Sequence, residues 1–203
     1  MHGRRVLAVA LAAVVVGACV HDGRGITAPA PGATVPASST TVTTQPGAVI
    51  GTVGPFILTS PAFPEGGTLD DRFTCFGAGI SPPLQWIGVP ADTVELAVSV
   101  TDEDEGGVLH WMMTGLDPTL VGLGDGTAPE GAIEAVNDTG AAGWYGPCND
   151  PNGAPHHYVF TLYALKAPSG VTQGAEAAAA LEAVKRQATA EAAVTGVYPA
   201  PPS

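Results

Sequence analysis

The sequence predicts an all-β domain that ends with one helix and a final strand. Its apolar segments are short, rich in β-branched and aromatic residues, and bounded by glycine and proline, as in strands joined by turns. The chain holds 27 glycines and 19 prolines among 203 residues, which favours turns over long helices. It shows no repeat of 20 to 50 residues and no alternation of strands with helices, so repeat folds and parallel α/β folds are excluded.

The first nineteen residues predict export and a lipid anchor. Arg4 and Arg5 precede an apolar run over residues 6–16, which is too short to cross a bilayer core of about 30 Å and is typical of a secretory signal. The run leads to Gly17-Ala18-Cys19, which resembles the lipobox of bacterial lipoproteins. In those proteins the signal, here residues 1–18, is removed and the cysteine receives a diacylglycerol thioether. A conventional cut after Ala18, with an unmodified cysteine, is the alternative.

A tether is predicted over residues 19–54. This segment is rich in Thr, Pro, Ala and Gly and lacks the large apolar side chains that offset the entropy of ordering a chain. As a flexible coil of about 35 residues it would hold the next domain roughly 30 Å from the anchor. O-linked sugar on its Thr/Ser cluster and an unmodified spacer are both open. The expected location is the extracytoplasmic face of the cell membrane.

The folded domain is predicted over residues 55–199, with a tail at 200–203. Strands are expected at residues 56–59, 95–100, 110–113, 158–165 and 191–198, and a helix at 175–187. The helix is alanine-rich, with an acid early and Lys185-Arg186 in its last turn, as the helix dipole favours.

Charge and motifs exclude several functions. A net charge of −12 is unsuited to nucleic acid or to a basic patch on anionic lipid. No nucleophile elbow, paired-cysteine zinc motif or complete calcium loop is present, and Gly122 to Gly126 does not open a helix as a nucleotide loop would. The sequence therefore predicts no metal and no cofactor.

Polar residues gather at the predicted strand ends, where β-scaffolds carry function. They comprise an acidic loop, a histidine that starts a strand, a glycine-rich aromatic loop and a second histidine: Asp102, Asp104, His110, Gly143, Trp144, Tyr145, Gly146, Pro147 and His156. Sequence spacing leaves open whether they converge on one pocket or are solvated separately, and a buried structural role is the alternative for His110.

At these residues the chain resembles the phosphatidylethanolamine-binding protein family, in its bacterial and archaeal Raf-kinase-inhibitor-like branch. The resemblance runs from Leu58 to about Tyr198 and rests on seven short motifs in the same order: residues 58–63, 73–75, 80–86, 110–111, 137–138, 146–148 and 156–158. It implies a β-sandwich with a large antiparallel sheet, a smaller sheet and peripheral helices, together with a small anion pocket.

The resemblance also implies which residues form that pocket. Asp102 and Asp104 match the two acids of the family's acidic loop, His110 and His156 match its histidines, and residues 143–147 match its glycine-rich loop. Two departures stand out: Glu103 and Gly106 replace prolines of the acidic loop, and His157 replaces a frequent arginine. Glu103 adds a negative charge to the acidic loop, and His157 removes a permanent positive charge near the mouth of the expected pocket.

Two functional classes follow. The first is a non-catalytic binding module for a phosphorylated or other anionic molecule, such as a phospholipid head group, which acts as an inhibitor or modulator of a protein partner. The second is a hydrolase that uses an Asp–His pair as general base. Cys75 and Cys148 remain once Cys19 is assigned to lipid, and in an oxidising compartment they form a disulfide or stay as two free thiols.

Substitution of the lipobox cysteine tests the anchor. Cys19→Ser removes the thiol that would carry diacylglycerol, so the protein should move from the membrane fraction to the aqueous phase on detergent partitioning. Intact mass of the membrane form should exceed the peptide mass by the acyl groups. Equal partitioning of Cys19→Ser and the unaltered chain would refute lipidation, and Ser39→Ala in the tether, which leaves the lipobox intact, is the control.

Overall fold

The computed structural model describes residues 54–149 and 154–198. The predicted signal at residues 1–18, Cys19, the tether as far as residue 53 and the tail at 200–203 lie outside the described residues. The fold is therefore that of the predicted domain.

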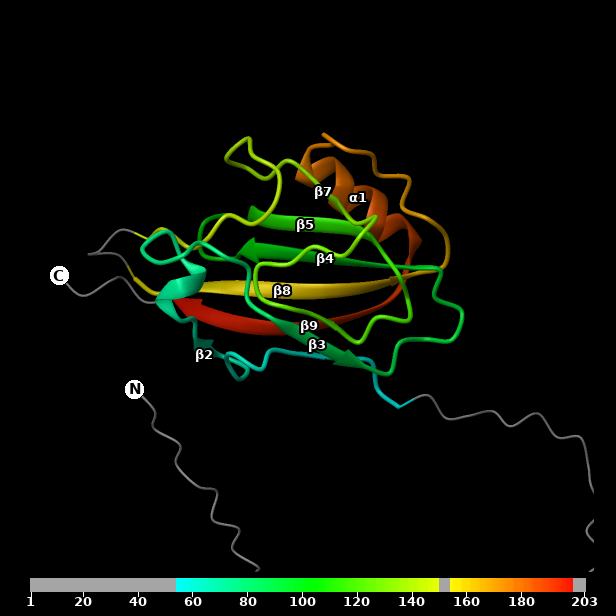
Figure 1. The fold of residues 1–203 in the computed structure, drawn as a ribbon, viewed down its shortest axis with the longest axis horizontal. Helices are drawn as coiled ribbons and strands as arrows, with labels where there is room; N and C mark the ends of the chain where they lie inside the picture. Colours follow the sequence, from blue (N-terminus) through cyan, green and yellow to red (C-terminus); the bar gives the residue numbers. More distant parts are fainter. Residues whose placement is uncertain (1–53, 150–153, 199–203) are drawn as a thin grey trace, which may run out of the picture. The chain divides into compact units, whose positions relative to one another are not determined.

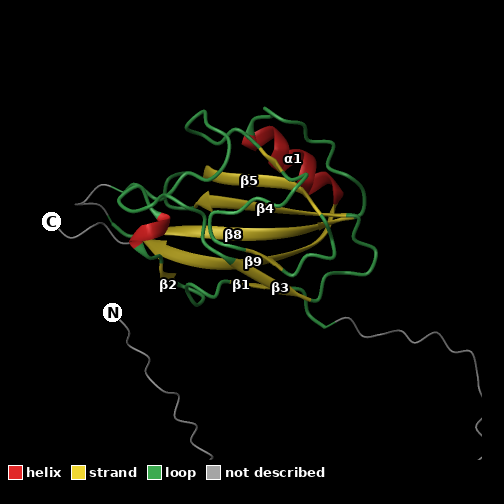
Figure 2. Ribbon diagram, viewed as in Figure 1, coloured by secondary structure: helices red, strands yellow, loops and turns green. Residues whose placement is uncertain are grey.

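Nine strands, one α-helix and one short 3₁₀ helix make up the described domain (Figures 1 and 2). In chain order they are β1 (Ile57–Thr59), β2 (Gly67–Thr68), η1 (Asp71–Phe73), β3 (Leu84–Ile87), β4 (Glu95–Asp102), β5 (Val108–Leu116), β6 (Gly122–Leu123), β7 (Ile133–Glu134), β8 (His156–Leu165), α1 (Ala177–Gln187) and β9 (Ala188–Tyr198).

Two sheets carry the fold. A six-stranded sheet has the order β2-β9-β8-β4-β5-β7, and a three-stranded sheet has the order β1-β3-β6. The large sheet is antiparallel except for the two-residue β2, which pairs parallel with β9. The predicted all-β class, the two sheets and the late helix are confirmed.

The central pair of strands, β4 and β8, divides the interior into two cores. Because neighbouring side chains of a strand point to opposite faces, Val98, Val100 and Phe160 pack toward the small sheet, with Leu84 and Trp86 among their neighbours. On the other face Ala97, Tyr163 and Leu165 pack against α1 through Ala177, Ala180 and Val184. The large sheet is thus covered on one face by the small sheet and on part of the other by α1.

The helix begins two residues later than the sequence predicts. Val136 forms a bridge with Glu176, donating its N–H to the Ala175 carbonyl and accepting from the Ala177 N–H. That bridge holds residues 175–177 extended, so Glu176 is the N-cap and no acid lies in the first turn. The expected early acid is therefore wrong, whereas Lys185 and Arg186 do lie in the last turn.

None of the helices within residues 54–149 and 154–198 is long and apolar enough to cross a membrane.

The open question about the two cysteines is resolved in favour of a disulfide. Cys75 and Cys148 are bonded, with a Cα–Cα distance of 5.4 Å, within the range that a bridge requires. They are 73 positions apart in the sequence. The bond joins the segment after η1 to the glycine-rich loop, and the Cys75 N–H also donates to the Pro147 carbonyl at 3.0 Å.

Removal of this disulfide should cost much of the stability of the domain. In the chain-entropy model, a closed loop of this length contributes about 4 kcal/mol by restricting the unfolded chain. The Cys75→Ala/Cys148→Ala variant should therefore unfold in urea with a free energy lower by about that amount. A difference below about 1 kcal/mol would contradict the prediction, and reduction of the unaltered protein provides an independent check.

Candidate functional site

The first part of the candidate site is an Asp–His pair where β4 ends beside the start of β8. Asp102 is fully buried, and its Oδ2 accepts from Nδ1 of His156 at 2.6 Å. The pairing of β4 with β8 places Asp102 opposite Tyr158, two residues along from His156. His156 is partly exposed, with 22% of its side chain open to solvent, whereas its partner Asp102 is fully buried.

His110 forms the second part, on the neighbouring strand β5. Its Nδ1 lies 2.7 Å from the Tyr145 carbonyl oxygen. A carbonyl can only accept, so Nδ1 carries the hydrogen and Nε2 of the neutral ring presents a lone pair. That Nε2 is buried and has no hydrogen-bond partner among the described residues. Burial lowers the pKa of His110 below its ordinary value of 6.5, against smaller opposing effects of its bond to Tyr145 and of Asp102, Glu105 and Asp138.

Aromatic rings join these two parts. The ring of Tyr158 meets His110 edge-on with 5.0 Å between centroids and stacks near His156 at 6.4 Å. Tyr145 stacks on the opposite side of His110 at 4.9 Å. Burial, reinforced by the charge of Asp102, raises the pKa of Tyr158 above its ordinary value, and its hydroxyl donates to Asn149. His110, His156 and Asp102 therefore belong to one continuous cluster, and the question of convergence that the sequence leaves open is answered in the structure for these three residues.

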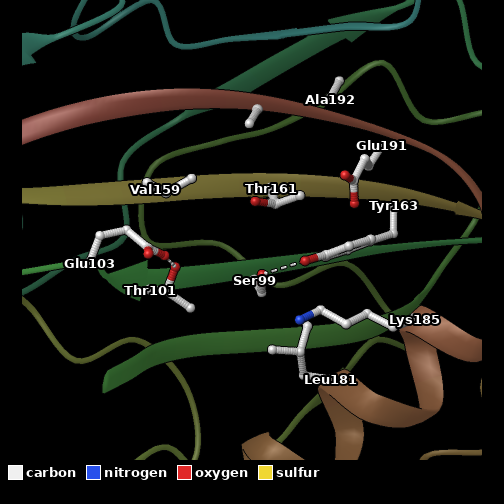
Figure 3. Close-up of a pocket in the computed structure, with 11 residues that line it drawn as sticks. Ser99, Thr101, Glu103, Val159, Thr161, Tyr163, Leu181, Lys185, Glu191 and Ala192 are labelled. Atoms are coloured by element: carbon white, nitrogen blue, oxygen red, sulfur yellow. Dashed lines mark hydrogen bonds between the residues drawn. The ribbon is translucent and has the colours of Figure 1, made fainter. Parts of the chain in front are cut away.

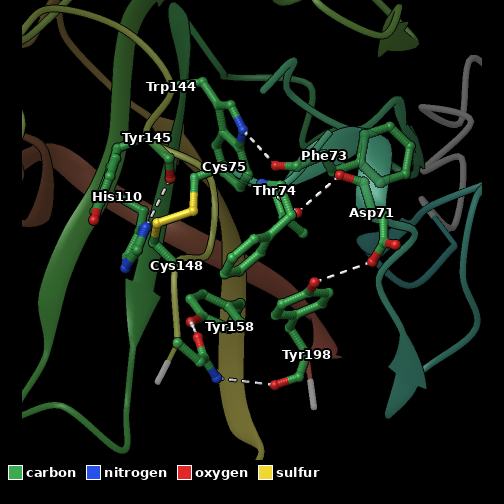
Figure 4. The surroundings of a disulfide bond; sticks show 12 residues. Asp71, Phe73, Thr74, Cys75, His110, Trp144, Tyr145, Cys148, Tyr158 and Tyr198 are labelled. Carbon is green, nitrogen blue, oxygen red and sulfur yellow. Dashed lines mark hydrogen bonds between the residues drawn. A yellow bond between two sulfur atoms is a disulfide. The ribbon is translucent and has the colours of Figure 1, made fainter. Parts of the chain in front are cut away.

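The glycine-rich loop is held against η1 (Figure 4). Trp144 donates from Nε1 to the Phe73 carbonyl at 3.0 Å and stacks on Phe160 of the core. Gly146 packs against the same backbone: a Cβ there would lie 2.6 Å from the Phe73 carbonyl oxygen. The loop therefore needs glycine at this position, and it brings Tyr145 to 4.9 Å and Trp144 to 6.5 Å from the ring of His110, measured between centroids.

The acidic loop splits into two roles. Asp102 turns inward, and its Oδ1 accepts from the N–H groups of Asp104 and Glu105, which shapes the turn. Asp104 instead accepts from the exposed His157, at 2.7 Å from its N–H and 2.8 Å from Nδ1. These bonds hold the pKa of Asp104 below its usual value. The two acids that the sequence places together thus pair with different histidines.

One group of potential metal ligands occurs among the described residues. Ligand atoms of Asp102, Glu105 and His156 lie within 4.8 Å of one another. The sequence predicts no metal, because it has no paired-cysteine motif and its acidic loop lacks the last glutamate of a calcium loop. Both Asp102 oxygens already accept hydrogen bonds, to His156 and to the turn, so the observed arrangement serves the Asp–His pair and a cation would have to displace it.

Several supporting residues were absent from the predicted site. Tyr158 and Asn149 connect the cluster to the C-terminal strand, because Asn149 Nδ2 donates to the Tyr198 carbonyl. Asn137 donates to the Gly143 carbonyl, and Asp138 accepts from the Leu109 N–H beside His110. The motif at 137–138 and the alternation along 158–165 were visible in the sequence, but neither shows which loop these side chains reach.

Comparison with known proteins places this geometry in a family. The sequence model described as "Phosphatidylethanolamine-binding protein" matches residues 59–199. A Mycobacterium tuberculosis protein named as a candidate lipoprotein, LppC, is 36% identical over 146 residues, which cover 71% of this chain and 72% of that protein. A UPF0098 protein of Methanothermobacter thermautotrophicus is 36% identical over 148 residues, 70% of this chain and 97% of its own length.

A solved structure is similar as well. The crystal structure of E. coli YbcL, titled a new member of the mammalian PEBP family, matches with a TM-score of 0.68 and 31% identity, over 71% of this chain and 98% of YbcL. The matched part corresponds in extent to the domain described above.

The burial of His110 predicts a pH-dependent stability. Its folded-state pKa lies below 6.5, so the unfolded chain binds more protons as the pH falls below that value, and folding free energy is lost in that window. His110→Gln should lose less stability than the unaltered protein between pH 7 and pH 5, as measured by urea unfolding. The exposed His157→Gln is the control and should keep the original dependence. Parallel pH profiles for His110→Gln and the unaltered protein would contradict the assignment.

Proposed function

The chain belongs to the phosphatidylethanolamine-binding protein family, and we propose that it is a lipid-anchored extracytoplasmic protein whose Asp102–His156–His110 cluster binds a small phosphorylated ligand. The observation that carries the proposal is the pair of imidazole rings with their Nδ1 atoms already engaged. The Nε2 of His110 has no hydrogen-bond partner among the described residues but is buried, so a ligand would enter beside the partly exposed ring of His156 and reach inward to it.

The two histidines can make complementary hydrogen bonds to one ligand, one as a donor and the other as an acceptor. His156 is held through Nδ1 by the buried carboxylate of Asp102, and an imidazolium in this position donates from Nε2 to a phosphoryl oxygen. His110 is kept neutral by burial, so its Nε2 accepts from a P–O–H group or from an ammonium. A phosphate monoester or phosphoethanolamine supplies both an oxygen acceptor and a donor, whereas sulfate supplies no donor.

Two further observations support the proposed location. The disulfide between Cys75 and Cys148 is expected in an oxidising compartment. One relative is named as a candidate lipoprotein, and the lipobox at Cys19 provides the matching anchor in this chain. A protein partner that is inhibited or modulated through the same pocket stays a prediction of the family resemblance.

Hydrolysis is the second candidate function, because the Asp102–His156 geometry is also that of a general base held by a carboxylate. The disulfide leaves neither Cys75 nor Cys148 as a thiol nucleophile. Catalysis would then require activation of water. Because neither cysteine of the domain is a free thiol nucleophile, we favour binding without turnover.

Ligand titration of the full-length chain in detergent tests the proposal. Phosphoethanolamine and methyl phosphate should bind saturably, and sulfate should bind more weakly. His110→Gln and His156→Gln should each weaken binding about 10-fold or more, as expected for loss of a hydrogen bond to a charged group.

The neighbouring His157→Gln is the matched control and should bind normally. Equal affinity of all three variants would reject the site. Release of phosphate that depends on His156 would replace the binding function with the hydrolase.

A further inference from the structure

A second hollow lies on the opposite face of the large sheet, in the corner between that face and α1 (Figure 3). We call it the α1 groove and define it by Ser99, Thr161, Tyr163, Lys185 and Glu191, with Thr101 and Glu103 at one end. Its volume is about 550 Å³, within the range of roughly 300–1,000 Å³ of small-molecule sites. The site described above uses Asp102 on one face of β4, and the groove uses Ser99 and Thr101 on the other.

Hydroxyl groups form the floor of the groove. The register places Ser99 opposite Thr161, and Thr161 opposite Ala193, so the neighbour of Thr161 on β9 has only a methyl side chain. The buried Ser99 and Tyr163 hydroxyls lie 3.3 Å apart and share one hydrogen bond. Two hydroxyls bring two protons, and one proton satisfies their mutual bond, so the other is available to an acceptor in the groove. The Thr161 hydroxyl makes no hydrogen bond to another described residue.

Charges of both signs line the same space. Lys185 extends from α1 toward the Ser99–Tyr163 pair, and Glu191 approaches from β9, where it pairs with Tyr163 in the sheet (Figure 3). Neither forms an ion pair within residues 54–149 and 154–198. At the far end, Glu103 accepts from the Thr101 hydroxyl at 2.8 Å. The groove is thus rich in both donors and acceptors.

The polar and charged groups of the groove indicate which class of ligand it can bind. An apolar molecule would bury the hydroxyls and carboxylates without partners, which costs free energy. A simple anion would face two glutamates, and a simple cation would face Lys185. A neutral polyhydroxylated molecule offers a donor and an acceptor at every hydroxyl, and its C–H groups fit the apolar contacts of Val159 and Leu181.

We propose that the α1 groove binds a neutral carbohydrate of one or two sugar units. The Ser99–Tyr163 pair, Thr161 and Lys185 donate to sugar oxygens, and Glu191 accepts from sugar hydroxyls. The groove is independent of the proposed phosphate site, because the two lie on opposite faces of β4. A surface-tethered protein would then contact saccharide through one face of its sheet and an anion through the other.

Amide chemical shifts of the full-length chain in detergent test the proposal. Titration with maltose, cellobiose and N-acetylglucosamine should shift the amides of Thr161 and Ala193 saturably for at least one sugar. Thr161→Val and Ser99→Ala should weaken that binding about 2- to 10-fold each, as expected for a neutral hydrogen bond. Ala193→Leu, at an exposed position, should fill the groove and abolish it.

Thr59→Val makes the same chemical change on the small sheet and is the matched control, expected to bind sugar normally. His110→Gln should also keep sugar binding, which separates this site from the phosphate site. The proposal is overturned if no sugar gives saturable shifts, if glycylglycine or inorganic phosphate binds the groove more tightly, or if the shifts depend only on protein concentration, which would indicate a second copy of the chain.

Discussion

The antiparallel pairing of β4 with β8 is the constraint on which the rest of the structure depends. Eight consecutive pairs, from Glu95 with Leu165 to Asp102 with Tyr158, fix which side chains share a face. One face builds the core beneath the small sheet and ends in the Asp102 cluster. The other meets α1 and then opens into the α1 groove. A slip of one residue in this register would exchange the two faces, so the core, the candidate site and the α1 groove all depend on the same pairing.

A second constraint brings the glycine-rich loop to the end of those strands. The disulfide at Cys148, the Trp144 bond to Phe73 and the close approach at Gly146 all tie the loop to η1. Only with the loop in that place does the Tyr145 carbonyl reach His110 and determine its tautomer. The proposed ligand chemistry of the Asp–His cluster therefore rests on contacts made by residues that need not touch a ligand.

Much of the fold and part of the site could be predicted from residue patterns. Strand positions followed from alternation, as at residues 158–165, because the period of two is a local property of the chain. The helix start was missed because a bridge to Val136, forty residues away, keeps Glu176 extended. Asp102, His110 and His156 were named as candidates from the sequence, and the structure brings them together. The pairing of Asp104 with His157 was not predicted, because the sequence of a turn does not show which way each of its two acids points.

The sequence by itself determined the alternation of polar and apolar residues along the strands, the presence of a late helix and the pair of cysteines available for a bridge. It also predicts the export signal. Only the tertiary structure decided that Cys75 meets Cys148, that Asp102 rather than Asp104 supports His156, that His110 has a buried nitrogen without a partner among the described residues, and that a hollow remains beside α1 on the large sheet. The physical reason is that side-chain alternation acts between neighbours along the chain. These contacts instead join residues 54 and 73 positions apart, whose meeting depends on the register of the whole sheet.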